Sequence, residues 1–194
     1  MLKRFLWLSM LAMAVQADVM LPTDEPSRWL ASQDGGDAPS VNAAEPYQGQ
    51  AALRFAYVNR KGYGNSMLEP VAVPPDAYGV RFKLFVERAV SASAMHLWFR
   101  EKDGDMWMCP VTPEDGKRIG EVTGSWRSVF IPLSLLNHQP RGDTKRHFLS
   151  SDRMMIGFNF GDQTVRIAGL TFVVRPAGAV PDRVDTPVSH SAEP

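Results

Sequence analysis

One stretch of the chain, LWFREKDGDMWM at residues 97–108, gathers side chains that could bind a ligand together. The Asp103-Gly104 pair inside it is a strong signal for a two-residue hairpin turn. This register pairs Arg100 with Trp107 across two short strands. Since successive side chains of a strand point to opposite faces, the hairpin then presents two chemically different surfaces.

One surface of the hairpin is apolar, and the other is aromatic and charged. The apolar surface, which we expect in the core, comprises Leu97, Phe99, Met106 and Met108. The opposite surface, which we call the predicted platform, comprises His96, Trp98, Arg100, Lys102, Asp105, Trp107 and Cys109. An exposed indole ring stacks on the C–H face of a pyranose, while Arg, His and Asp side chains hydrogen-bond its hydroxyls. The predicted platform therefore has the chemistry of a sugar-binding surface.

Basic residues on a second strand could extend this platform. Arg81 and Lys83 lie on the polar face of a predicted strand at 78–87. If that strand neighbours the hairpin, the platform is positive and favours uronate or sulfated sugars, because Arg pairs bidentately with carboxylates. The predicted ligand-binding residues are Trp98, Arg100 and Trp107, with His96, Arg81 and Lys83 as outer contacts.

An alternative is that the two tryptophans are packed away and bind nothing. The segment 25–50 contains Trp29 and Tyr47, which could cover the platform. Arg stacked on Trp is also a common decoration of a solvent-facing sheet and needs no ligand. A single hairpin register decides between these interpretations, because a slip of one residue exchanges the two faces.

The sequence gives little support for catalysis. It contains no His-Glu-x-x-His motif, no metal-spaced Cys/His set and no apparent Ser-His-Asp order. Glu101, Asp103 and Asp105 are close in sequence, but acids at a turn are ordinarily solvated, and the twelve-residue calcium-loop pattern is absent after Asp105. The single cysteine, Cys109, precedes a proline and is predicted to be a small sheet residue. We therefore predict a protein that is not an enzyme.

Period-two alternation over short segments predicts the elements that position these residues. Predicted strands, besides the hairpin, lie at 52–58, 78–87, 126–133, 155–161 and 165–174. A face switch at Ala168-Gly169 in the last strand predicts a β-bulge. Short helical turns are predicted at 25–32 and 134–138, and a loop at 33–50. This pattern indicates an all-β fold, an antiparallel β-sandwich with one buried face per sheet.

The two ends of the chain differ from the predicted sandwich, and the first of them predicts export. Residues 1–17 read as a signal peptide, with Lys3 and Arg4, an apolar run of eleven residues and small residues before a cleavage site at Ala17. That run is too short to span a membrane, so we expect a secreted or periplasmic protein with no membrane span after cleavage. The sandwich domain is predicted at 18–175 and a disordered Pro/Ser-rich tail at 176–194.

The 194 residues carry 21 basic and 21 acidic side chains, which gives no reason to expect nucleic acid as a partner.

The order of these pieces resembles a known family. GQAALRF, YGVRFKLFV, LWFREKDGDMW, GSWRSVFIPLSLL, MMIGFNFG and VRIAGLTFV, within residues 49–174, are similar to the galactose-binding-domain-like jelly rolls, and among these to exported carbohydrate-binding modules. The resemblance implies a jelly-roll sandwich that binds a poly- or oligosaccharide without catalysis and needs no cofactor. It also implies a separate glycan-active enzyme or an envelope protein as a partner.

Two further expectations come from the same resemblance. Relatives often hold a structural calcium ion and carry Asp just before the final apolar run, where this chain has Ala168-Gly169, so calcium is doubtful although Asp24 or Glu25 could supply part of a site. The same sandwich also serves as a protein-docking or structural domain, and a fold alone does not decide between these functions.

Overall fold

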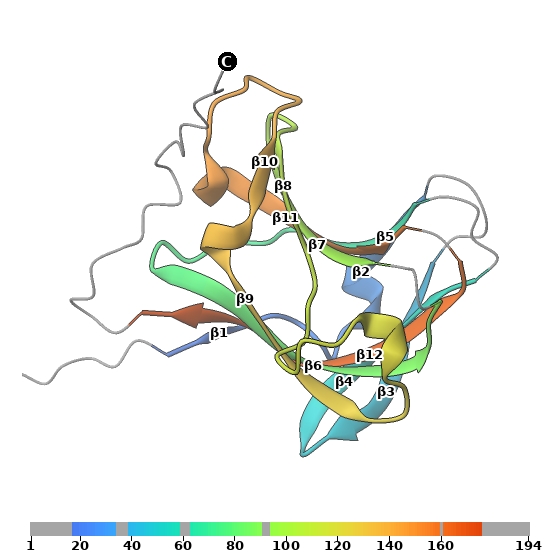
Figure 1. The fold of residues 1–194 in the computed structure, drawn as a ribbon. Coiled ribbons are helices and arrows are strands. Elements are labelled where there is room, and N and C mark those ends of the chain that lie inside the picture. Colours follow the sequence, from blue (N-terminus) through green and yellow to red (C-terminus); the bar gives the residue numbers. More distant parts are fainter. Residues whose placement is uncertain (1–16, 34–38, 59–62, 91–93, 160, 176–194) are drawn as a thin grey trace, which may run out of the picture.

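The structure is a computed structural model that describes residues 17–33, 39–58, 63–90, 94–159 and 161–175. These residues form two antiparallel sheets that pack face to face (Figure 1). Each sheet has six strands in the described part of the chain. The predicted fold class, an antiparallel β-sandwich, is confirmed.

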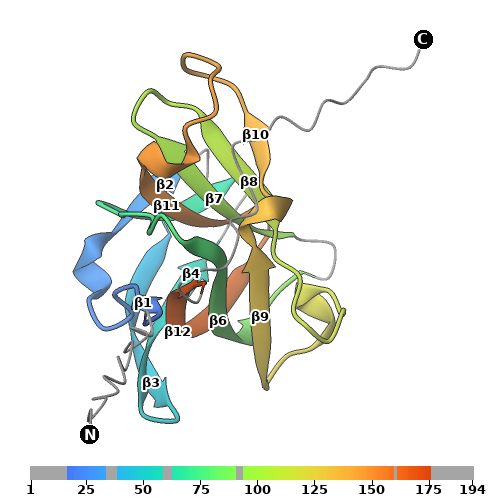
Figure 2. The same cartoon turned by 90° about the vertical axis from the view of Figure 1, so that its left-hand side faces the viewer.

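The first sheet, sheet A, contains four of the five strands predicted outside the hairpin. Its order is β3 (Ser40–Tyr47), β4 (Gln50–Tyr57), β12 (Gln163–Val174), β6 (Ala77–Arg88) and β9 (Trp126–Pro132), with the short β1 (Val19–Met20) paired to β12. Figure 2 shows β12, β6 and β9 side by side in this layer.

The second sheet, sheet B, contains the predicted hairpin. Its order is β10 (Asn137–Gln139), β8 (Met106–Pro110), β7 (Met95–Glu101), β11 (Ser151–Phe158), β5 (Gly64–Leu68) and β2 (Trp29–Gln33). In Figure 1 the sheet is curved, and the face turned away from sheet A lies on the inside of the curve. We call this face the curved face.

Short 3-10 helices connect the strands. They are η1 (Pro26–Arg28), η2 (Ile119–Glu121), η3 (Leu133–Leu135) and η4 (Phe148–Ser150). Within the described ranges, no helix has the length and apolar character needed to cross a membrane.

The core lies between the sheets and is built by alternation. In β6 every second side chain is buried, from Val80 to Val86, and in β4 Leu53, Phe55 and Tyr57 are fully buried. The Tyr57 hydroxyl donates a hydrogen bond to the Ile156 carbonyl at 2.8 Å and so joins the two sheets. Burial of these large side chains supplies most of the driving force for folding, because the chain has one cysteine and hence no internal disulfide.

The predicted β-bulge in the last strand is confirmed. The register between β12 and β6 shifts between Ala168 and Thr171, and Gly169 has a φ of +60°. A residue with a Cβ is strained in this left-handed region, which explains the glycine at the point where the inward-facing side chains change parity.

The loop predicted at 33–50 is wrong in part, because residues 40–47 form β3. Most side chains of this edge strand are exposed or half-buried, so it lacks the apolar alternation from which the other strands were inferred. The helical turn predicted at 25–32 shortens to η1 and continues as β2. Trp29 on β2 packs edge-on against Phe55 in the core, with ring centroids 5.0 Å apart, and does not cover the predicted platform.

Candidate functional site

The β7–β8 hairpin has a different register from the predicted one. Its strands pair Phe99 with Trp107 and Trp98 with Met108. The loop is one residue longer: the Gly104 N–H donates to the Glu101 carbonyl at 3.0 Å, and Gly104 has a φ of +110°. This is the three-residue loop in which a turn is followed by a left-handed glycine. The predicted two-residue turn is therefore wrong.

The slip of one residue exchanges the two faces of β8. Trp107 is 2 % exposed and lies in the core, where its ring packs 4.8 Å from His138 and 5.5 Å from Phe148. Its indole N–H donates to the buried Glu101 carboxylate at 2.5 Å. Met106 and Met108, which were predicted for the core, turn outward instead. The prediction that Trp107 is an exposed stacking residue is wrong.

Arg81 and Lys83 also lie away from the hairpin. Both are on β6, in sheet A, and their side chains project from the opposite side of the sandwich. Arg81 forms an ion pair with Asp18 at 3.5 Å, and the Lys83 ammonium donates to the Ser128 hydroxyl at 2.7 Å. The premise of a positive platform, that β6 neighbours the hairpin, is not met.

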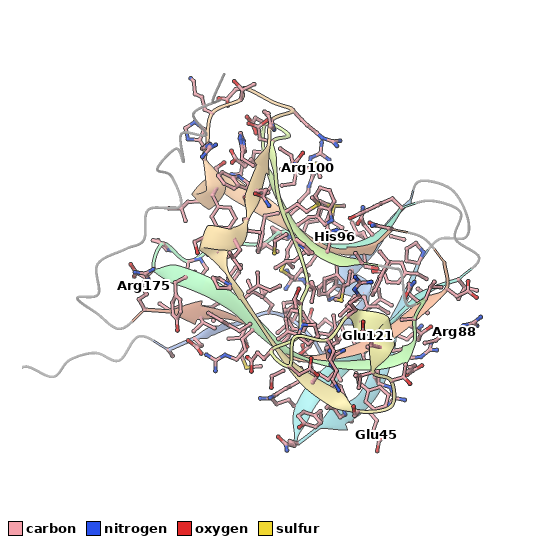
Figure 3. All side chains as sticks on the ribbon, viewed as in Figure 1. Glu45, Arg88, His96, Arg100, Glu121 and Arg175 are labelled. Atoms are coloured by element: carbon pink, nitrogen blue, oxygen red, sulfur yellow. The ribbon has the colours of Figure 1, made fainter. Side chains whose placement is uncertain are left out.

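Three of the predicted residues do come together on the curved face. His96, Trp98 and Arg100 alternate along β7 on the side away from the core, and Figure 3 labels the first and the last of these. Met155 lies opposite Trp98 on β11, and Met108 lies opposite it on β8. Arg100 is exposed, whereas His96 and Trp98 are half-buried. The curved face thus has an aromatic centre with an apolar border.

Tyr63, which the sequence did not single out, completes the aromatic centre. Its ring lies 5.6 Å from Trp98 in an edge-on arrangement and 6.1 Å from His96. The Trp98 indole N–H donates to the Tyr63 hydroxyl at 2.6 Å. Burial raises the pKa of the Tyr63 phenol well above its usual value, so the group stays neutral. We call Tyr63, His96 and Trp98 the aromatic cluster.

A second feature of the curved face was also missed by the sequence. Gly157 on β11 lies between Asn65 on β5 and His96 on β7, in one row across the sheet. A Cβ placed on Gly157 would fall 1.9 Å from Asn65 Oδ1, so the Asn65 side chain lies directly over the glycine. Buried Asn65 Oδ1 and His96 Nδ1 have no hydrogen-bond partner among the described residues. Burial lowers the pKa of His96, which keeps its imidazole neutral at pH 7.

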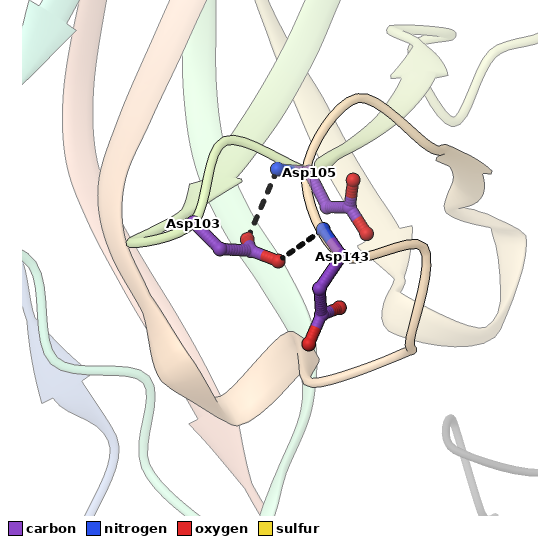
Figure 4. Close-up of side chains that lie close together, drawn as sticks. All are labelled: Asp103, Asp105 and Asp143. Atoms are coloured by element: carbon purple, nitrogen blue, oxygen red, sulfur yellow. Dashed lines mark hydrogen bonds between the residues drawn. The ribbon is translucent and has the colours of Figure 1, made fainter.

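Acidic side chains gather at the tip of the hairpin, where three carboxylates lie within 4.8 Å of one another. These are Asp103, Asp105 and Asp143 (Figure 4). Asp103 accepts from the backbone N–H groups of Asp105 at 3.1 Å and Asp143 at 3.0 Å, and Asp105 accepts from those of Arg141 and Gly142. These donors lower the pKa of both carboxyls. The carboxylates thus tie the 141–143 segment to the hairpin.

Glu101 has the same kind of role next to this cluster. Its buried carboxylate accepts from the His147 backbone N–H at 3.0 Å as well as from Trp107.

Asp24 and Glu25, the suggested contributors to a calcium site, are exposed residues before η1 and are not part of the Asp103 cluster. Cys109 is buried in the core, which raises the pKa of its thiol to about 11 and leaves it a poor nucleophile.

Solved structures share this arrangement of sheets. A family 11 carbohydrate-binding module from Clostridium thermocellum, in complex with a β-1,3-1,4-mixed-linked tetrasaccharide, matches with a TM-score of 0.61 and 15 % identity over 81 % of this chain and 95 % of that one. A family 30 carbohydrate-binding module of a cellulosomal cellulase from the same organism matches with a TM-score of 0.53 and 15 % identity over 82 % and 99 %. The chain has the fold of a carbohydrate-binding module.

At this level of identity, the likeness concerns the fold. It confirms the predicted resemblance to the jelly-roll carbohydrate-binding modules for the architecture of the sandwich. No protein-family model matches the chain, and no curated protein matches it. The functional argument therefore rests on the side chains of this chain.

Proposed function

We propose that this protein is an exported, non-catalytic carbohydrate-binding protein whose curved face holds a poly- or oligosaccharide. The observation that carries the proposal is the position of Trp98 on this face, half-buried and fixed by its hydrogen bond to Tyr63. Because the indole N–H is already used, Trp98 offers a ligand its ring surface, which suits the C–H face of a sugar. The exposed Arg100 guanidinium, on the same face, supplies hydrogen-bond donors.

The shape of the face and the related folds support this proposal. A sheet that curves around its ligand buries more of an extended chain than a flat sheet does. The family 11 module named above is described in complex with a tetrasaccharide. Export follows from the signal peptide predicted at residues 1–17, of which residues 1–16 lie outside the described ranges, and places the protein outside the cytoplasm with its glycan. We also propose that a separate glycan-active enzyme or an envelope protein is a partner of this protein.

The experiment that tests this proposal compares two tryptophans on opposite sides of the sandwich. We expect Trp98→Ala to lose about fivefold or more in affinity for the glycan that binds the wild type, since ring stacking contributes about 1 kcal/mol or more. Trp126→Ala is the matched control, because Trp126 is also half-buried but lies on the outer face of sheet A beside Phe85. Affinity electrophoresis in soluble β-1,3-1,4-glucan, xylan, polygalacturonate and alginate provides the readout.

Two results would contradict the proposal. One is equal retention of Trp98→Ala and the wild type in every gel that slows the wild type. The other is a wild type that migrates freely through all of these polysaccharides and through a wider panel of soluble glycans.

A second candidate function, protein docking, is favoured by the apolar border of the curved face. Leu30 is 45 % exposed, and Met67, Met106 and Met108 are half-buried around the aromatic cluster. Flexible Met side chains adapt to apolar partners, so this border also suits a polypeptide. A partner protein would protect Trp98 from acrylamide quenching when glycans do not, whereas the first candidate predicts protection by a glycan.

A further inference from the structure

The row formed by Asn65, Gly157 and His96 carries polar groups that the fold itself does not use. In the outer layer of a sheet, polar atoms are satisfied by neighbours or by water, and a buried one without a partner destabilises the fold. Among the described residues, two buried atoms without a hydrogen-bond partner, Asn65 Oδ1 and His96 Nδ1, occur on either side of one glycine. Unsatisfied groups in a folded protein require an explanation, and service to a ligand is one.

The row lies next to the aromatic cluster. Along β7, His96 and Trp98 are two residues apart, which places their side chains about 7 Å from each other on one face. Their ring centroids are 6.2 Å apart. A pyranose ring is of similar width, so a sugar resting on Trp98 brings its hydroxyls to the row.

Both polar side chains can turn toward such a ligand. Each is half-buried, so part of its surface already faces the solvent. The terminal torsion of Asn and of His is soft and roughly two-fold. Among the described residues, neither Asn65 Oδ1 nor His96 Nδ1 has a hydrogen-bond partner, so rotation about this torsion brings the atom outward without breaking such a bond.

The glycine makes this rotation possible. A Cβ at position 157 would lie 1.9 Å from Asn65 Oδ1 and 2.9 Å from the Gly64 carbonyl oxygen. Any other residue there would push Asn65 aside and fill the space between the two polar groups. The strand conformation of Gly157 does not itself require a glycine, since its φ is not positive. The requirement is therefore one of space.

We propose that Asn65 and His96 form a hydroxyl-recognition pair across Gly157, which hydrogen-bonds one sugar unit of the glycan that lies on Trp98. This inference rests on the proposed function and names the residues that select the orientation of the bound sugar. The pair recognises hydroxyl groups, which both donate and accept, through an amide and an imidazole that carry no charge at pH 7. Burial, which lowers the pKa of His96, favours this neutral form.

The test uses the full chain with Asn65→Ala, His96→Ala and the double variant. We expect each single substitution to weaken binding of the retained polysaccharide about three- to tenfold, since one hydrogen bond contributes about 0.5–1.5 kcal/mol. Asn42→Ala and His147→Ala are matched controls, because Asn42 is exposed on β3 in sheet A and the His147 side chain is 56 % exposed. Isothermal calorimetry with soluble β-1,3-1,4-glucan, xylan, polygalacturonate and alginate gives the affinities.

Two additional readouts separate a ligand contact from a structural role. We expect the melting temperature of Asn65→Ala to equal or exceed that of the wild type, because Asn65 Oδ1 has no hydrogen-bond partner to lose among the described residues, and that of His96→Ala to fall only slightly, through the loss of its ring contacts with Tyr63 and Trp98. We also expect partial O-methylation of the bound polysaccharide to lower its affinity for the wild type more than its affinity for the double variant. Such non-additivity is the sign of groups that interact directly. A lower melting temperature together with equal sensitivity to methylation would make the row structural and overturn the inference.

The remaining outcomes distinguish this inference from the proposed function. If Trp98→Ala loses the glycan while the double variant binds it as the wild type does, the hydroxyl pair is wrong and carbohydrate binding on the curved face stands. If the wild type binds none of the four polysaccharides, and none in a wider panel of soluble glycans, both are wrong.

Discussion

The outer faces of the two sheets differ in how they use their polar side chains. On sheet A, the Glu87 carboxylate accepts from Arg54 at 2.8 Å and from Arg166 at 2.5 Å, and Lys83 donates to Ser128. On sheet B, the buried atoms Asn65 Oδ1 and His96 Nδ1 have no hydrogen-bond partner among the described residues. The charged side chains named on sheet A thus have their cross-strand partners within the protein.

This comparison shows why charge in a sequence is a poor guide to a binding face. Arg54, Arg81 and Lys83 attract attention because they are basic and alternate with core residues. In the fold they meet acids or hydroxyls on or next to the same sheet, and such pairs stabilise the surface without any ligand. On the other side of the sandwich two neutral groups, an amide and an imidazole, remain available beside the exposed Arg100.

The largest effect should come from Trp107, which the comparison places on neither outer face. We expect Trp107→Ala to lower the free energy of unfolding by about 3–5 kcal/mol, because it empties a large core position and leaves the Glu101 carboxylate without its indole donor. Urea unfolding followed by circular dichroism measures this change. The folded fraction should retain the affinity of the wild type for glycan, and an unchanged stability with lost retention would restore Trp107 to an outer face.

An intermediate effect is expected from Gly157→Ala, which closes the space between Asn65 and His96. The added Cβ meets the Gly64 carbonyl oxygen at 2.9 Å, and backbone cannot move aside as a side chain can. We expect a loss of about 1–3 kcal/mol in the free energy of unfolding, together with weaker glycan binding. Thermal melting and calorimetry on the same preparation test both parts; full affinity in this variant would show that the space over the glycine is not used.

The smallest effect is expected from Glu87→Gln on sheet A. Its ion pairs with Arg54 and Arg166 are partly exposed, with 40 % and 29 % of the arginine side chains accessible. Screening by solvent limits such pairs to about 1 kcal/mol or less. Glycan affinity should stay at the value of the wild type. A marked loss of affinity in calorimetry would move the ligand to sheet A and reverse the comparison of the two faces.

Much of the fold could be predicted because alternation is a local property. The inner faces of β4, β6 and β9 follow directly from side chains that repeat every second residue, and the bulge follows from the switch at Gly169. The strand β3 could not be predicted in this way, since an edge strand with a solvated surface needs no apolar repeat. The site was predicted in part: His96, Trp98 and Arg100 share one face, whereas Tyr63, Asn65 and Gly157 join them only through neighbouring strands.

The sequence alone determined that the chain forms period-two strands, and where the apolar faces of β4, β6, β9 and β12 lie. It did not determine the register of the β7–β8 hairpin, because Asp103-Gly104 suits both a two-residue and a three-residue loop. The tertiary structure decided this point. With the longer loop, Trp107 fills the space beneath η4, and Glu101 and Asp105 accept hydrogen bonds from the backbone of the 141–147 segment. Those partners lie 36 to 46 residues further along the chain, beyond the reach of any local pattern.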